Sequence, residues 1–102
     1  MTVAARNELV IEGVVVRVEA GRFTPAGLAA THLALRHQPH PDRAETGAEF
    51  DVEVVAYGDL AQSMQDLSPG DAILIKGRLQ RKHRRSMALA IQANQFKFAS
   101  KG

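Results

Sequence analysis

The stretch that decides the fold of this chain is EFDVEVVAYGDLAQSMQDLSPGDAILIKGRLQ, residues 49–80. Its first part, Glu49–Tyr57, and its last part, Ala72–Gln80, each alternate apolar with polar or charged side chains for most of their length. Such alternation is typical of half-buried β-strands. Gly58 ends the first run, and Ser68-Pro69-Gly70-Asp71 is a turn directly before the second. The stretch therefore predicts two strands that are separated by a short segment of another kind.

That intervening segment carries the signals of one short amphipathic helix. Asp59 is a favourable N-cap residue and Gln62 follows three positions later, which predicts a capping box. Leu60, Met64 and Leu67 recur at helical spacing and would form one apolar side. We therefore expect a short helix between the two strands.

Two further strands are expected on the N-terminal side. Leu9–Val18 is rich in β-branched residues, and Gly13 within it predicts a bend or bulge, as in a strand that curls around a barrel. Arg22–Gly27 contains a proline and a final glycine and predicts a hairpin connection to a second strand over Leu28–His37. Gln38–Ala48 holds two prolines, a glycine and alternating charges, and predicts an exposed, mobile loop.

A fifth strand is expected on the C-terminal side, over Met87–Phe98. In each strand, alternate positions should share one face, and those of the fourth and fifth strands should point inward. The expected apolar faces comprise Thr31, Leu33 and Leu35 in the second strand, Phe50, Val52, Val54 and Ala56 in the third, Ile73, Ile75 and Leu79 in the fourth, and Leu89, Ile91 and Ala93 in the fifth.

The expected order is strand, strand, strand, helix, strand, strand. A short helix between strands three and four of a five-stranded barrel is the layout of the OB-fold, an all-β Greek-key barrel. A length of 102 residues fits one such domain over residues 1–102. OB-folds bind oligonucleotides on the face of strands two and three and with the loops that join strands one to two and four to five.

The charges of the chain are strongly segregated. The net charge is only +2, but all 11 acidic residues lie in residues 1–71 together with five arginines, whereas residues 72–102 hold eight basic residues and no acidic one. Five of those basic residues, with His83 among them, fall between Arg78 and Arg85, and the run Arg81–Arg85 lies on the expected loop between strands four and five. Like charges at this density are tolerated on a solvated turn, but they favour an anionic partner. Their position on an OB-fold loop favours the second interpretation.

The composition excludes several classes of protein. The chain has no cysteine, which removes disulfides, zinc ribbons and thiol nucleophiles and fits a reducing cytoplasm. No apolar run approaches the ~20 residues that a membrane helix needs. Residues 1–8 lack the basic start and apolar core of a secretory signal. We therefore expect a cytoplasmic protein.

Catalytic and metal-binding patterns are weak. His32, His37 and His40 are close in sequence, but no cysteine or well-spaced carboxylate completes a metal site. Asp51 and Glu53 alternate on the third strand, and we interpret them as a solvent-facing polar stripe rather than a catalytic pair. Zinc-protease, P-loop and nucleophile-elbow motifs are absent from the sequence. The sequence predicts neither an enzyme nor a metal or cofactor site.

Five short stretches, in order, resemble the bacterial single-stranded-DNA-binding proteins along nearly the whole chain. They are Leu9-Val10-Ile11-Glu12-Gly13, Arg22-Phe23-Thr24-Pro25-Ala26-Gly27, Val54-Val55-Ala56-Tyr57-Gly58-Asp59-Leu60-Ala61, Gly70-Asp71, and Ile75-Lys76-Gly77-Arg78-Leu79. Two departures, the absence of tryptophan and of an acidic-tipped extension after the fifth strand, indicate a short branch of that family. That branch is similar to the primosomal replication proteins N (PriB), which Leu35-Arg36-His37 and the basic loop also fit.

The resemblance implies a homodimer of OB-folds that binds single-stranded DNA and the restart helicase PriA, and that hands over to later primosome proteins. By position, Arg22 would contact DNA from the loop between strands one and two, and Tyr57 would be a stacking aromatic. Phe50 is the nearest replacement for a tryptophan at the start of strand three. The full set of predicted nucleic-acid-binding residues is Arg22, Arg36, Phe50, Tyr57, Lys76, Arg78, Arg81, Lys82, Arg84 and Arg85.

Two features leave the DNA path open. Phe50 lies opposite Tyr57 in an alternating strand, so both stack on one flat face only if the strand is bulged. Asp51 and Glu53 share the face of Tyr57 and would repel DNA, unless it passes mainly over the basic loop and strands four and five. The acidic half could instead meet a basic partner. Phe96 and Phe98 are expected to be packing residues.

Phosphate contacts should therefore dominate binding, with little sequence preference. Because such contacts do not distinguish the sugar, an RNA-binding OB protein is an alternative. A protein-interaction adaptor with little contact to nucleic acid is another.

Overall fold

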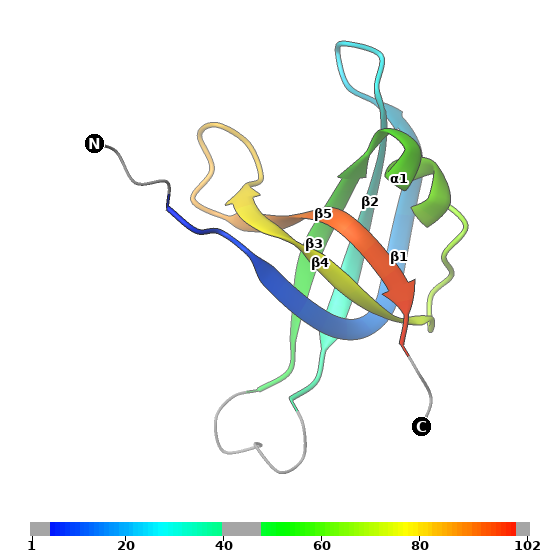
Figure 1. Cartoon of the computed structure of the whole chain (residues 1–102), viewed down its shortest axis with the longest axis vertical. Helices are drawn as coiled ribbons and strands as arrows, with labels where there is room; N and C mark the ends of the chain where they lie inside the picture. Colours follow the sequence, from blue (N-terminus) through cyan, green and yellow to red (C-terminus); the bar gives the residue numbers. More distant parts are fainter. Residues whose placement is uncertain (1–4, 40–47, 100–102) are drawn as a thin grey trace.

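Five strands close into a single barrel in the order β1-β2-β3-β5-β4 in the computed structural model, which describes residues 5–39 and 48–99 (Figure 1). The elements are β1 (Leu9–Phe23), β2 (Ala29–His37), β3 (Phe50–Tyr57), α1 (Gly58–Met64), β4 (Ala72–Arg81) and β5 (Leu89–Phe98). All neighbouring pairs are antiparallel except β3 and β5. The predicted all-β OB-fold, with one short helix between its third and fourth strands, is confirmed.

Strand β1 closes the barrel by pairing with two partners. Its first half pairs with β4 as far as Val14, and its second half pairs with β2 from Val14 to Phe23. Gly13 lies at this change of partner, where an added Cβ would be 2.5 Å from the Arg36 carbonyl oxygen. Register shifts between Val14 and Phe23 bend the strand further. The strand therefore curls as predicted, but it ends at Phe23 and not at Val18.

The connections agree with the expected turns where they are described. The β1–β2 turn is shorter than Arg22–Gly27, because the Thr24 N–H donates to the Leu28 carbonyl at 2.8 Å and closes it. In the expected loop Gln38–Ala48, residues 40–47 lie outside the described residues, and His40 with them. Within the described ranges, no helix is long and apolar enough to cross a membrane.

The core fills the barrel interior with side chains from every strand and from α1. It comprises Val15, Leu33, Leu35, Val54, Ala56, Ala61, Met64, Leu67, Ile73, Ile75, Ile91 and Ala93. The predicted inward residues of β2 and β3 are buried or packed against the core, except Phe50, which is exposed, and Val55 of the predicted outer face is buried as well. Phe96 packs against this core as expected, whereas Phe98 is exposed.

The expectation that Leu79 and Leu89 point into the core is wrong. Strand β4 has no β1 partner beyond Gly77, and β5 has no β3 partner before Ile91. Past these positions the two strands pair only with each other and form a hairpin that overhangs the barrel. Leu79 and Leu89 lie on this overhang and are exposed, because no opposite wall covers them.

Helix α1 begins without the predicted capping box. Tyr57 is the N-cap, no side chain caps the helix, and Asp59 lies in the first turn. The helix follows β3 directly, so the last strand residue takes the cap position, and Gly58 makes the sharp change of direction at φ 67°. The apolar side is as predicted, with Met64 buried and Leu67 buried just past the helix end.

Thr31 attaches α1 to the barrel. Its buried hydroxyl donates to the Ala61 carbonyl at 2.7 Å. We expect Thr31→Val, which keeps the shape but removes the donor, to lower the free energy of unfolding by about 1 kcal/mol. Urea unfolding measures this change, and Thr31→Ser, which keeps the hydroxyl, is the matched control. An unchanged midpoint for Thr31→Val would show that the bond contributes nothing.

Candidate nucleic-acid interface

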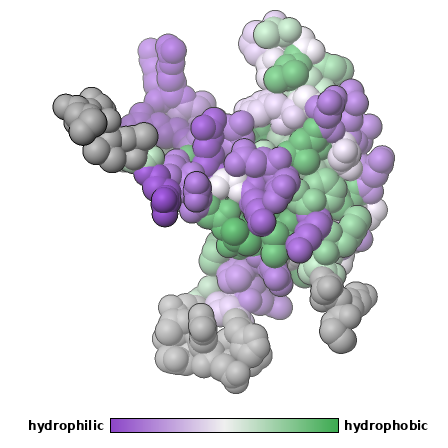
Figure 2. Space-filling view, viewed as in Figure 1, coloured by the Kyte–Doolittle hydropathy of each residue, from purple (hydrophilic) through white to green (hydrophobic). Residues whose placement is uncertain are grey.

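The β4–β5 hairpin ends in a short cationic turn that projects from the barrel (Figure 1). The Lys82 N–H donates to the Ala88 carbonyl and the Ser86 N–H to the His83 carbonyl, both at 3.0 Å. The Arg81 guanidinium donates to the Arg84 carbonyl at 3.0 Å, across the turn. These bonds define the backbone, while residues 81–85 are all exposed. The tip is the hydrophilic column at the upper left of Figure 2.

No carboxylate among residues 5–39 and 48–99 forms an ion pair with the cations of this tip. Among the described residues, the ion pairs are Arg17–Glu19, Arg22–Glu19 and Arg36–Asp51, and all of them lie on β1, β2 and β3. The cations of residues 81–85 therefore stand together in solvent, where they repel one another and attract an anion.

Lys76 and Arg78 extend the cationic surface from the tip down the wall of the barrel. Both side chains are exposed on the outer face of β4, as predicted, because they alternate along the strand with the buried residues Ile75 and Gly77. The Arg78 guanidinium donates to Gln92 Oε1 at 3.1 Å, and Gln92 is its register partner on β5. The predicted cations of β4 and the tip thus all lie on one hairpin.

Arg36 and Asp51 neutralise each other on the neighbouring wall. They are register partners on β2 and β3, and the guanidinium donates two bonds to the carboxylate, at 2.8 and 3.1 Å. The hydrogen bond from Arg36 lowers the pKa of Asp51. From the sequence, Asp51 was expected to repel DNA, but its charge is compensated by Arg36. Because Arg36 is in this ion pair, it is not free to bind a phosphate in this structure.

We expect Arg36→Ala to raise the pKa of Asp51 towards its ordinary value. The folded pKa is the lower one, so the contribution of the pair to stability is present above the ordinary pKa and is lost as pH falls through the lowered pKa. Carboxyl chemical shifts followed by NMR during an acid titration measure this directly. An identical Asp51 titration in the variant and the wild type would contradict the prediction.

Arg22 was predicted in the loop between the first two strands. It lies instead near the end of β1, which is longer than expected. There it shares the Glu19 carboxylate with Arg17, at 3.3 and 3.4 Å. Its positive charge is thus partly compensated. The structure does not bring Arg22 into the cationic hairpin.

The aromatic candidates lie on different faces. The β2–β3 register has no shift, so Phe50 and Tyr57 remain on opposite sides of β3. Tyr57 is half-buried on the outer face, whereas Phe50 packs at 5.3 Å against the His37 ring. The bulge that a common stacking surface requires is absent from this strand as described.

Two residues that sequence reasoning missed support the hairpin. The first is Gln92, which accepts the bond from Arg78. The second is Asn7, whose side-chain nitrogen donates to the Leu79 carbonyl at 2.8 Å and whose side-chain oxygen accepts from the Leu79 N–H at 2.9 Å. Leu9 pairs with Gly77, so the register points to Asn7 as the neighbour of Leu79. That signal depends on pairing 72 positions apart in the chain and is invisible in the local pattern.

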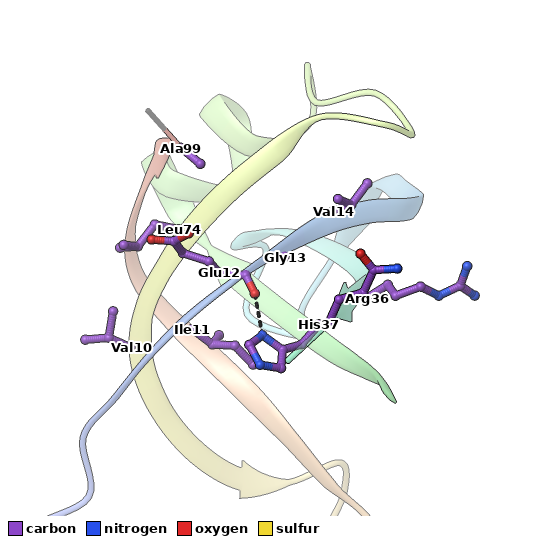
Figure 3. Close-up of a pocket in the computed structure, with 10 residues that line it drawn as sticks. Val10, Ile11, Glu12, Gly13, Val14, Arg36, His37, Leu74 and Ala99 are labelled. Carbon is purple, nitrogen blue, oxygen red and sulfur yellow. Dashed lines mark hydrogen bonds between the residues drawn. The ribbon is translucent and has the colours of Figure 1, made fainter. Parts of the chain in front are cut away.

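A shallow groove of about 470 Å³ crosses β1 beside the ends of β2 and β4 (Figure 3). Exposed Val10 and Val14 contribute apolar surface. His37 Nδ1 lies 2.7 Å from the main-chain oxygen of Glu12, so the contact does not involve the Glu12 carboxylate. The Arg36 side chain extends away from His37 (Figure 3). The described residues hold no cluster of three or more metal-ligating side chains.

A closed barrel of this topology defines an OB-fold protein, and the cationic β4–β5 hairpin gives it a surface that attracts a polyanion. Residues 7–95 match the model of a family described as another single-strand binding protein family. The chain belongs to this family, and the predicted resemblance is confirmed.

The relatives include the particular branch that the sequence suggested. Replication restart protein PriB of Nitrosomonas europaea is 28% identical over 88 residues, which cover 84% of this chain and 82% of that protein. The solved structure of PriB from Ralstonia solanacearum superimposes with a TM-score of 0.82 at 28% identity, covering 94% of this chain and all of that one. A single-stranded DNA-binding protein of Thermus thermophilus is 37% identical over 76 residues, but these span only 28% of its length.

Proposed function

We propose that this chain binds single-stranded DNA through the cationic hairpin, as an accessory protein of the replication-restart primosome. The observation that carries the proposal is the exposed turn 81–85 with no carboxylate partner among the described residues. Each phosphate that a cation neutralises releases condensed counterions, with a salt slope of about −0.7 per contact on single strands. Lys76, Arg78 and the four cations of the tip would together give a slope of roughly −4.

Fluorescence polarisation with a labelled oligo-dT at several salt concentrations tests the proposal. We expect measurable binding of modest strength at low salt and a steep, linear fall of log affinity with log salt. Absence of binding at low salt, or binding that ignores salt, would overturn it. Competition with an RNA oligonucleotide of matched length distinguishes DNA from RNA preference, since phosphate contacts alone do not read the sugar.

We further propose a homodimer that assists the PriA helicase. The exposed valines of the β1 groove support a self-association surface, because water-exposed apolar area of this kind is stabilised by burial. The match to PriB proteins over most of their length supports the restart partner. Analytical ultracentrifugation tests the dimer, and a pull-down with purified PriA tests the partner. If PriA binds while the DNA titration stays flat, the adaptor alternative is favoured.

We also propose that residues 1–102 form one domain, that it acts in the cytoplasm, and that it is a binding protein rather than an enzyme. The strands from Leu9 to Phe98 all belong to one barrel, which supports the first point. The relatives reported above carry the names of binding and restart proteins, which supports the last.

A further inference from the structure

The overhanging hairpin exposes apolar side chains directly beside its cations. Leu79 is 41% exposed, Leu89 is 50% exposed and Met87, in the turn, is 86% exposed. Single exposed apolar residues are common on proteins, but three on one short hairpin need a reason. The sequence placed two of them in the core, and the structure leaves them uncovered.

Leu79 and Leu89 lie on the same face of the hairpin. Leu79 pairs with the inward-facing Ile91, and Leu89 pairs with Arg81, two residues further along β4 from Leu79. Directly opposed residues and residues two apart share a face, so Leu79 and Leu89 are diagonal neighbours. This face continues the lining of the barrel interior past the rim, and Arg81 lies on it beside Leu89. With Met87, we call this surface the hairpin strip.

The occupant of the strip must be both anionic and apolar. Single-stranded DNA has this combination, because each nucleotide carries one phosphate and, on its sugar, one base with a flat, weakly hydrated face. Through Arg81 the strip is continuous with the cations of the tip, which have no carboxylate partner in the part of the chain that the structure describes. The chain lacks tryptophan, and its candidate stacking aromatics lie on opposite faces of β3, so the aromatic platform is incomplete.

We propose that the bases of bound single-stranded DNA pack on the hairpin strip while the cations of the tip hold the phosphates. This inference rests on the proposed DNA binding and adds to it a contact that salt does not screen. Phosphate contacts set the salt slope, whereas base contacts set the affinity that remains when the slope is extrapolated to high salt.

The test compares labelled oligo-dT with an abasic oligonucleotide of equal length, for the wild type and for Met87→Ser/Leu89→Ser. We expect the wild type to prefer oligo-dT about tenfold, since burial of aliphatic side-chain surface against bases contributes on the order of one tenfold step. The double variant should lose this preference and keep the salt slope. Phe98→Ser, an exposed apolar residue at the other end of β5, is the control that should keep both.

The outcomes separate this inference from the proposed function. If the wild type binds neither oligonucleotide at low salt, DNA binding itself fails. If it binds both and the double variant keeps the wild-type preference, the strip does not contact bases and the inference is wrong. A protein partner would then be the occupant to test. Thermal melts verify folding, and Met87→Ser alone, at the most exposed of the three positions, must lower the preference even if the double variant is unstable.

Discussion

Replacing Lys82, Arg84 and Arg85 by alanine should weaken binding to single-stranded DNA and flatten its salt dependence by about two units of slope, since each lost phosphate contact removes about 0.7. With an unchanged affinity at 1 M salt, a slope change of this size corresponds to a roughly 10²- to 10³-fold loss at 50 mM. The turn should remain folded, because the bond that Arg84 makes across it uses its main-chain carbonyl. Arg81 stays in place, since its guanidinium donates that bond.

The measurement is a polarisation titration of labelled oligo-dT over a series of salt concentrations. The matched control exchanges the same cations, Lys82→Arg, Arg84→Lys and Arg85→Lys, and should keep the wild-type slope because the number of charges is unchanged. If the alanine variant keeps the wild-type slope, the tip does not contact phosphates. The hairpin would then be a solvated turn, which is the ordinary interpretation of an isolated charge cluster.

Gly77→Ala should destabilise the barrel more than any surface substitution in it. An added Cβ would overlap the Gln92 carbonyl oxygen and would come to 3.0 Å from its carbon and 3.1 Å from the Ala93 Cα. These are backbone atoms of the paired strand, so no side-chain rotation relieves the overlap, and β4 must move off β5. We expect a loss of about 3 kcal/mol, at the upper end of overpacking costs.

For a domain of this size, a loss of about 3 kcal/mol lowers Tm by roughly 12 °C or more, which calorimetry measures. Gly27→Ala is the control for the loss of glycine itself: its φ of 85° strains an alanine, but nothing lies within 4 Å. It should cost only about 1 kcal/mol. Because Gly77 lies at the base of the hairpin, its variant should also weaken DNA binding. Equal melting of Gly77→Ala and wild type would contradict the steric argument.

The sequence predicted where the candidate site lies in the fold, but it did not predict correctly which residues belong to it. The order of elements placed the cationic run on the loop between the last two strands, and the structure agrees. Arg22 and Arg36 are chemically identical to Arg84, yet ion pairs with Glu19 and Asp51 engage them. Those pairs depend on bulges and register between strands, which no local pattern encodes. The role of each predicted residue in binding stays a prediction.

By itself, the sequence determined the five strands, the helix between the third and fourth, and the separation of acidic and basic halves. Periodicity and turn chemistry act over a few neighbouring residues, so they can be read locally. The tertiary structure alone decided where the barrel wall ends. Because β1 leaves β4 at Gly77 and β3 meets β5 only near Ile91, Leu79 and Leu89 pass from the expected core to an exposed hairpin. Burial is a property of pairing between distant segments, and alternation specifies only which side a residue faces.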